Sequence, residues 1–160
     1  MKKQAWFWIL GIVLLLVGVW FVSAGNRGEV PTERTTREVA LTCTTDMATE
    51  FHIHPVLEIH IEGVKQVIPS NIGIKPSCMT ALHTHTADGI IHVESPEKRD
   101  FTLADFFAVW EKPFGRDRIL DHVADETHRV WMTVNGTEVD TFENTVFRDQ
   151  DQIAIYYETI

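Results

Sequence analysis

The chain has 160 residues, of which 44% are hydrophobic and 23% are charged, and its formal net charge is −9. This length and composition allow one globular domain of about 115 to 130 residues with a single hydrophobic core. The acidic charge excludes nucleic acid as an expected partner, since binding it depends on neutralising phosphates with Lys and Arg.

The first 24 residues form an apolar leader. Lys2 and Lys3 precede an uncharged run, residues 5–24, that is long enough to cross a bilayer as a helix. The two lysines favour a cytoplasmic N-terminus, so we expect residues 1–24 to be a transmembrane anchor and the following domain to be extracytoplasmic. A cleaved signal peptide is the alternative, because the small residues at 22–24 fit the cleavage rule, and the protein would then be secreted.

Residues 25–40 are polar and lack a hydrophobic period, which predicts a linker between the anchor and a domain over residues 41–160. The two cysteines, Cys43 and Cys78, fall in the exported domain, where a structural disulfide is the default expectation. Such a bridge would stabilise the fold by roughly 3 to 4 kcal/mol in the chain-entropy model. Cys78 as a thiolate metal ligand is the alternative.

The pattern of the domain predicts hairpins first and one main helix later. Alternating apolar residues and turn signals predict hairpins over 51–68 and 79–94 and further strands at 129–134, 137–139 and 149–157. A helix is predicted from a cap at Thr102 through Trp110 by its 3.6-residue apolar period, and we consider a short helix around 119–123. We therefore expect an α+β fold, with a mixed or mainly antiparallel sheet covered by one principal helix.

The last third of the chain carries the turn Asn135-Gly136 and the run Asp149-Gln150-Asp151-Gln152-Ile153-Ala154-Ile155. This part resembles the end of β-grasp, ubiquitin-like sulfur carriers. The resemblance implies a β-grasp-like C-terminal part. Such carriers end in Gly-Gly, whereas this chain ends in Thr159-Ile160, so the resemblance supports a fold and argues against carrier function.

Six of the eight histidines lie between residues 52 and 92. Neutral imidazole is the commonest protein metal ligand, so two His-x-His pairs predict a transition-metal site. The first pair, His52 and His54, would share one strand face with His60, and Pro55 would make that strand an edge strand with reachable imidazoles. We expect this pair to complete the main site or to form a second one, and we expect His60 to be the least important.

The second pair, His83 and His85, belongs to a predicted hairpin with His92. If Asp88-Gly89 is a two-residue turn, His85 pairs with His92 and His83 pairs with Glu94. These side chains would form one patch that holds a metal through three imidazoles, an arrangement similar to the zinc sites of carbonic anhydrases. Glu94 would be a ligand, a general base or, in our preferred interpretation, an acceptor for an imidazole N–H.

The histidines allow more than one function. We expect a membrane-anchored extracytoplasmic module that binds a copper or zinc ion, with His83, His85 and His92 as the main ligands. A different interpretation is a non-metal interaction domain that binds an envelope protein and is stabilised by the disulfide. A zinc-dependent hydrolase or hydratase is a third interpretation, but no catalytic residue is assigned, because the sequence has no Gly-x-Ser-x-Gly, phosphate-loop or Cys-x-x-Cys motif.

Several phrases between residues 51 and 110 form a recognisable set: FHIH at 51–54, IPSNIGI at 68–74, CMTALHTH at 78–85, GIIHVES at 89–95 and FTLADFFAVW at 101–110. Together they resemble a group of uncharacterised prokaryotic exported proteins with one N-terminal anchor. The resemblance implies an exported, anchored domain and no particular reaction. Val56 and Thr86 depart from the pattern of that group, so the resemblance assigns no role to these two positions.

Overall fold

The computed structural model describes residues 33–45 and 49–160. The chain separates into two units, residues 1–33 and 34–160, and the helices and strands given below belong to the second unit. The predicted anchor, residues 1–24, lies outside the described residues. Within the described ranges, no helix is long and apolar enough to span a bilayer.

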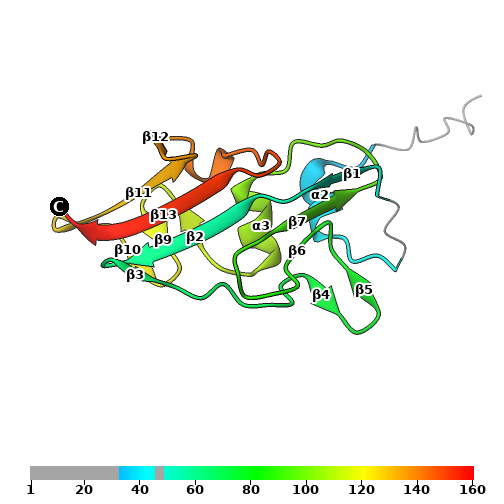
Figure 1. The fold of residues 1–160 in the computed structure, drawn as a ribbon, viewed down its shortest axis with the longest axis horizontal. Coiled ribbons are helices and arrows are strands. Elements are labelled where there is room, and N and C mark those ends of the chain that lie inside the picture. The colour runs from blue at the N-terminus through cyan, green and yellow to red at the C-terminus, as the bar shows by residue number, and fades with distance from the viewer. Residues whose placement is uncertain (1–32, 46–48) are drawn as a thin grey trace, which may run out of the picture. The chain divides into compact units, whose positions relative to one another are not determined.

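The described part of the chain is mainly strands with one principal helix, which confirms the α+β class (Figure 1). Its elements in chain order are α2 (Thr36–Leu41), β1 (Phe51–Ile53), β2 (Val56–Ile61), β3 (Val64–Lys65), β4 (Ile74–Lys75), β5 (Cys78–Met79), β6 (Leu82–His83), β7 (His92–Ser95), α3 (Leu103–Val109), β8 (Phe114–Gly115), β9 (Arg118–Ile119), β10 (His122–Val123), β11 (His128–Val134), β12 (Thr137–Val139), the 3-10 helix η1 (Phe142–Asn144) and β13 (Gln152–Thr159).

The largest sheet has the strand order β12-β11-β13-β2-β3. Strand β13 is parallel to β2, whereas the other neighbours are antiparallel, so the sheet is mixed. Two tight turns end its hairpins, Glu62-Gly63 and Asn135-Gly136, and all four of these residues have positive φ. This conformation matches the twist of the flanking strands, which is why glycine is favoured in such turns.

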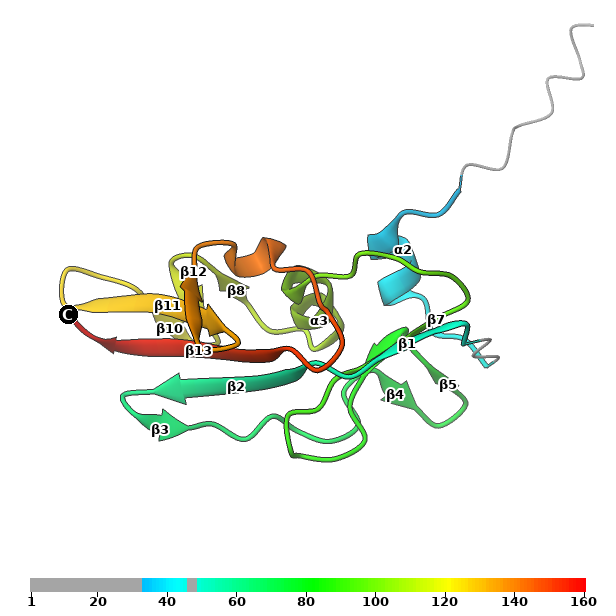
Figure 2. The same cartoon turned by 45° about the horizontal axis from the view of Figure 1, so that its top comes forward.

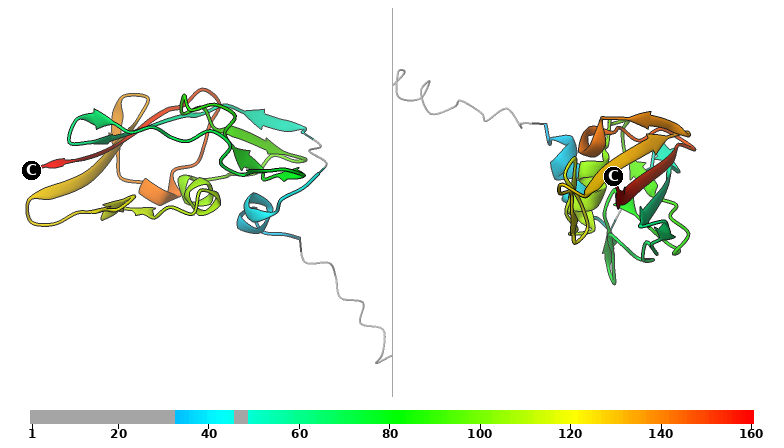
Figure 3. Two further views of the ribbon diagram at one scale, coloured as in Figure 1. Left: turned by 90° about the horizontal axis from the view of Figure 1, so that it is seen from below. Right: turned by 90° about the vertical axis from the view of Figure 1, so that its left-hand side faces the viewer.

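Helix α3 lies on one side of the large sheet (Figures 2 and 3). Its buried residues, Leu103, Phe106 and Phe107, join Leu57 and Ile155 of the sheet in one hydrophobic core. The prediction of a short helix around residues 119–123 is wrong. The segment instead contains the end of β9, a turn and β10; β9 pairs with β10 on one edge and with β8 on the other.

A second sheet has the order β1-β7-β6, with β7 in the centre. The predicted register of its hairpin is wrong: His83 pairs with His92, whereas we expected His85 opposite His92. Asp88-Gly89 does not close a two-residue hairpin, and residues 84–91 form a longer connection. The shift is two residues, an even number, so His83 and His92 still share one face of the sheet.

This connection is long because it pairs with a different segment. Ile90 forms an antiparallel bridge with Val56, and the Leu57 N–H donates to the Gly89 carbonyl oxygen at 2.9 Å. The contact ties the loop to the start of β2, so it joins the two sheets.

Helix α2 begins inside the segment expected to be a linker. Its Val39 and Ala40 are buried. Arg37 forms a 3.0 Å ion pair with Asp105 of α3, which connects the two helices. The packed domain therefore starts before residue 41.

The predicted disulfide between Cys43 and Cys78 is confirmed. Next to it, Thr44 and Met79 exchange two backbone hydrogen bonds of 2.8 and 3.0 Å. The disulfide and this bridge hold the segment after α2 against β5. Because its sulfur is bonded to Cys43, Cys78 is not a thiolate ligand, and that alternative is wrong.

We expect Gly89→Ala to destabilise the fold more than Gly63→Ala. Both glycines have positive φ (88° and 75°), where alanine costs about 1 to 2 kcal/mol. A Cβ at Gly89 would also lie 2.3 Å from the Leu57 carbonyl oxygen, whereas one at Gly63 would meet nothing within 4 Å. The extra loss should be about 1 to 3 kcal/mol, as for overpacked sites. Denaturant unfolding of both variants measures it, and equal losses would contradict this account of the loop.

Candidate metal centre

The sheet β1-β7-β6 has one apolar face and one face that bears histidines. Three buried residues lie side by side across its strands: Ile53, Val93 and Leu82. Because side chains alternate along a strand, the neighbours of these residues point to the other face. That face carries His52 opposite Glu94, and in the next row His92 opposite His83.

Five histidines meet here, because His54 and His85 lie two residues after His52 and His83, and both of their rings contact His92. The ring centroids lie 4.4 Å apart for His52–His54, 4.7 Å for His54–His92, 5.7 Å for His52–His92, 4.8 Å for His83–His85, 4.6 Å for His85–His92 and 5.4 Å for His83–His92. Two groups of three, His52/His54/His92 and His83/His85/His92, have their ligand atoms within 4.8 Å of one another and could hold a metal ion. We call these five residues the five-histidine patch. The two pairs recognised in the sequence are therefore parts of one patch.

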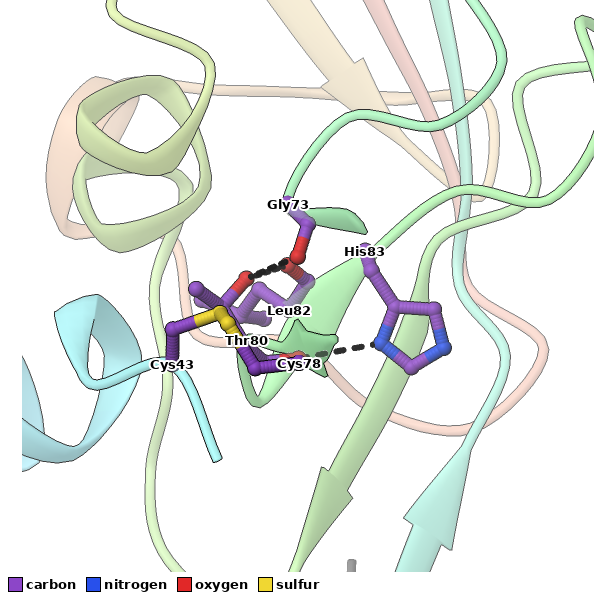
Figure 4. The surroundings of a disulfide bond; sticks show 6 residues. All are labelled: Cys43, Gly73, Cys78, Thr80, Leu82 and His83. Carbon is purple, nitrogen blue, oxygen red and sulfur yellow. Dashed lines mark hydrogen bonds between the residues drawn. A yellow bond between two sulfur atoms is a disulfide. The ribbon is translucent and has the colours of Figure 1, made fainter. Parts of the chain in front are cut away.

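His83 is the histidine that the fold fixes most tightly. It is fully buried, and its Nδ1 lies 3.1 Å from the Thr80 carbonyl oxygen (Figure 4). A carbonyl oxygen only accepts, so Nδ1 carries the proton and donates it, and Nε2 bears the lone pair. Figure 4 shows Nε2 directed away from Thr80, and within residues 33–45 and 49–160 it has no hydrogen-bond partner. Such an orphaned buried acceptor is unfavourable, and a metal ion would satisfy it.

Two histidines of the patch, His92 and His83, have a lowered pKa. Burial, followed by the neighbouring His85, His54 and His83, lowers the pKa of His92 from 6.5 to about 4, although the charge of Glu94 acts in the opposite direction. Burial is also the largest cause of the lowered pKa of His83. A histidine ligand must be unprotonated at the coordinating nitrogen, so these shifts favour metal binding at neutral pH.

Glu94 brings a carboxylate into the patch. Its Oε1 lies 3.1 Å from Nε2 of His52, 3.8 Å from Nδ1 of His92 and 4.0 Å from Nε2 of His83. The side chain is only 15% exposed, which limits screening of its charge by solvent. Glu94 can therefore accept a hydrogen bond from His52, and it places a negative charge where a bound cation would need one.

Two groups that position the histidines were not recognised in the sequence. One is the carbonyl oxygen of Thr80, which sets the tautomer of His83. The other is Asp149, on the loop before β13, whose Oδ1 accepts from the backbone N–H of His54 at 2.9 Å. No sequence motif marks a backbone carbonyl or an aspartate 95 residues away from the histidine that it contacts.

The remaining three histidines lie outside the patch. His60 stacks on Tyr156 of the large sheet, with centroids 5.1 Å apart. His122 and His128 each contact the ring of Tyr157 with centroids 5.0 Å apart, so they are half-buried and not simply solvated. None of the three belongs to either histidine group that could hold a metal ion.

No protein-family model, curated protein or solved structure gives a significant match to the chain. The fold and the patch together define an α+β protein with a candidate histidine metal centre. What this centre can do follows from the geometry of its own residues.

We expect the metal-free protein to lose stability as the pH falls from 7 to 4. The pKa of His92 is about 4 in the folded state, against 6.5 for an unperturbed histidine, so between these values the unfolded chain binds more protons. Protonation therefore favours unfolding in this window, and the lowered pKa of His83 acts in the same direction. The free energy of unfolding from denaturant titrations at several pH values measures the effect. His92→Gln, which does not titrate, should show a shallower dependence, and an identical slope would contradict this assignment.

Proposed function

We propose that the chain is a membrane-anchored extracytoplasmic protein that binds a transition-metal ion, copper or zinc, through the five-histidine patch. His83, His85 and His92 are the main ligands, and His52 and His54 complete the site. One observation carries the proposal: the buried Nε2 of His83 bears a lone pair that no donor among the described residues satisfies, and burial lowers the pKa of both His83 and His92. Metal coordination is the interaction that uses such a lone pair.

The donors of the patch are nitrogen atoms, with one carboxylate beside them. Imidazole suits both Cu(II) and Zn(II), and the disulfide leaves no free thiolate that would favour Cu(I). For a given nitrogen site the affinity order of divalent ions places Cu(II) above Zn(II). Copper is therefore the ion we expect at equal availability, and zinc is the alternative.

The extracytoplasmic location is part of the same proposal. Residues 1–24 have the length and charge pattern of an anchor with its N-terminus in the cytoplasm. The Cys43–Cys78 disulfide is of the kind that persists in oxidising compartments. A protein partner, in this proposal, belongs to the cell envelope.

We also propose that residues 56–65 and 128–159 form a β-grasp arrangement. The strand order β3-β2-β13-β11-β12 supports it, because the first and last long strands, β2 and β13, are parallel neighbours at the centre. β2 forms one hairpin with β3, and β13 pairs with the other hairpin, β11–β12. α3 lies between the two hairpins in the sequence. This arrangement leaves the histidine-bearing sheet as an addition at the start of β2.

Combining His83→Gln with His85→Ala should lower the affinity for the Cu(II) or Zn(II) ion that these two residues hold by more than about 100-fold, because the change removes two ligands and not merely their supporting contacts. Competition titrations against a chelator of known affinity, with the full-length chain in a mild detergent, measure the loss. Chelation should also lower the melting temperature of the metal-loaded wild type, because a ligand that binds only the folded state stabilises it.

A matched control removes two histidines outside the patch, His60→Ala with His122→Ala, and should keep wild-type affinity. Two results would contradict the proposal: no stoichiometric metal on the wild type, or equal affinities for the two double variants. A melting temperature that chelators leave unchanged but reductants lower would instead support the non-metal interaction domain.

Glu94→Gln should weaken metal binding by about 10- to 100-fold, as is typical when a group that orients ligands is changed. The substitution keeps the shape of the side chain and removes its charge, which lies within 4.0 Å of three histidine nitrogens. Glu58→Gln is the control, because Glu58 contacts His60 and Lys65 outside the patch. The same titration compares the two variants, and an unchanged affinity for Glu94→Gln would show that its carboxylate does not support the metal.

A further inference from the structure

His92 occupies a unique position in the patch, because it belongs to both groups of three. It lies on β7, which pairs with β1 on one edge and with β6 on the other. Its ring contacts His52 and His54 on the β1 side, and His83 and His85 on the β6 side. The two groups share no other residue.

The patch also contains more donors than one ion uses. A tetrahedral or square-planar centre takes four protein ligands at most, whereas here five imidazoles and the Glu94 carboxylate are present. Each group of three is compact, with its ligand atoms within 4.8 Å. Each group can therefore serve one ion, provided that His92 serves both.

An imidazole has two nitrogens, and those of His92 are inequivalent in this fold. Nδ1 lies 3.5 Å from Nε2 of His52 and 3.8 Å from the Glu94 carboxylate, so it faces the β1 side. Nε2 is then the nitrogen left for the group that contains His83 and His85. The Nε2 lone pair of His83 accepts no hydrogen bond from any described residue, so it is available to that group.

We propose that the patch binds two transition-metal ions and that His92 bridges them as an imidazolate. One ion binds His92 Nδ1 with His52 and His54, and the other binds His92 Nε2 with His83 and His85. This proposal rests on the metal-binding function proposed above. With metal–nitrogen bonds of about 2.0 to 2.1 Å on either side of the ring, the two ions would lie roughly 6 Å apart.

Neither metal-binding step changes the oxidation state of the ion or of the ring. The first ion binds one nitrogen of neutral His92, while the other nitrogen keeps its hydrogen. The second ion replaces that hydrogen, which leaves to the solvent as a proton. The ring then carries one negative charge, and the Glu94 carboxylate 3.8 Å from Nδ1 adds another, so these two anionic groups offset the repulsion between the cations.

A copper titration of the full-length chain in mild detergent tests the bridge. We expect two Cu(II) ions per chain by elemental analysis after dialysis. The integrated paramagnetic resonance signal should stay well below two spins, because an imidazolate couples the two unpaired electrons. His52→Ala with His54→Ala should bind one ion with a full single-spin signal, since it removes one group and leaves the other. His92→Ala should abolish the coupling.

The copper titration of the wild type tests the imidazolate bridge even if His92→Ala does not fold. Saturation at one ion per chain, or two ions with a full uncoupled signal, would overturn the bridge and leave the proposed metal binding intact. No stoichiometric copper would overturn both. His122→Ala, outside the patch, should reproduce the wild-type stoichiometry and signal.

Discussion

The candidate centre depends on the pairing of β7 with strands on both of its edges. This pairing is driven by apolar residues: Ile53, Val93 and Leu82 form one buried row across the three strands. Burying each of them contributes about 1.5 to 3 kcal/mol, and a slip of one residue would move the whole row to the other face. The hydrophobic face therefore fixes which side chains share the opposite one, and that face holds the histidines.

Contacts outside the patch hold the β6 edge of the same sheet in place. Strand β6, which carries the buried Leu82, packs against α3, while the Cys43–Cys78 disulfide and the Thr44–Met79 bridge hold the segment just before it. That segment supplies the Thr80 carbonyl oxygen that orients His83. The α3 contact, the disulfide and the Thr44–Met79 bridge therefore all help to position the His83 imidazole. A ligand held in place before binding loses little conformational entropy when the ion arrives, which favours affinity.

Local signals in the sequence predicted a large part of this structure. The Asn135-Gly136 turn, the helix that follows Thr102 and the disulfide depend on neighbouring residues or on the expected compartment, and the structure contains all of them. The five candidate ligands were also recognised: two His-x-His pairs supplied four of them, because this spacing on a strand places both rings on one face, and the predicted hairpin supplied His92. Two predictions failed: the short helix around residues 119–123 and the register of the hairpin that contains His83 and His92. Asp88-Gly89 has the local signal for a tight turn, but the bonds of residues 89–90 to residues 56–57 override it. A contact across more than 30 residues leaves no local pattern to detect.

Packing alone does not account for a histidine at the fully buried position 83. A buried polar atom without a partner costs about 1 to 3 kcal/mol, whereas an apolar side chain of similar size would be buried at a gain. A second cost falls on His92, because burial and then the neighbouring imidazoles disfavour its protonated form and lower its pKa to about 4. Both costs disappear when a cation replaces the missing donor and binds the lone pairs that the patch directs toward one another. The apo fold thus maintains an unfavourable arrangement that metal coordination would make favourable, and the buried row of Ile53, Val93 and Leu82 supplies the free energy that holds it.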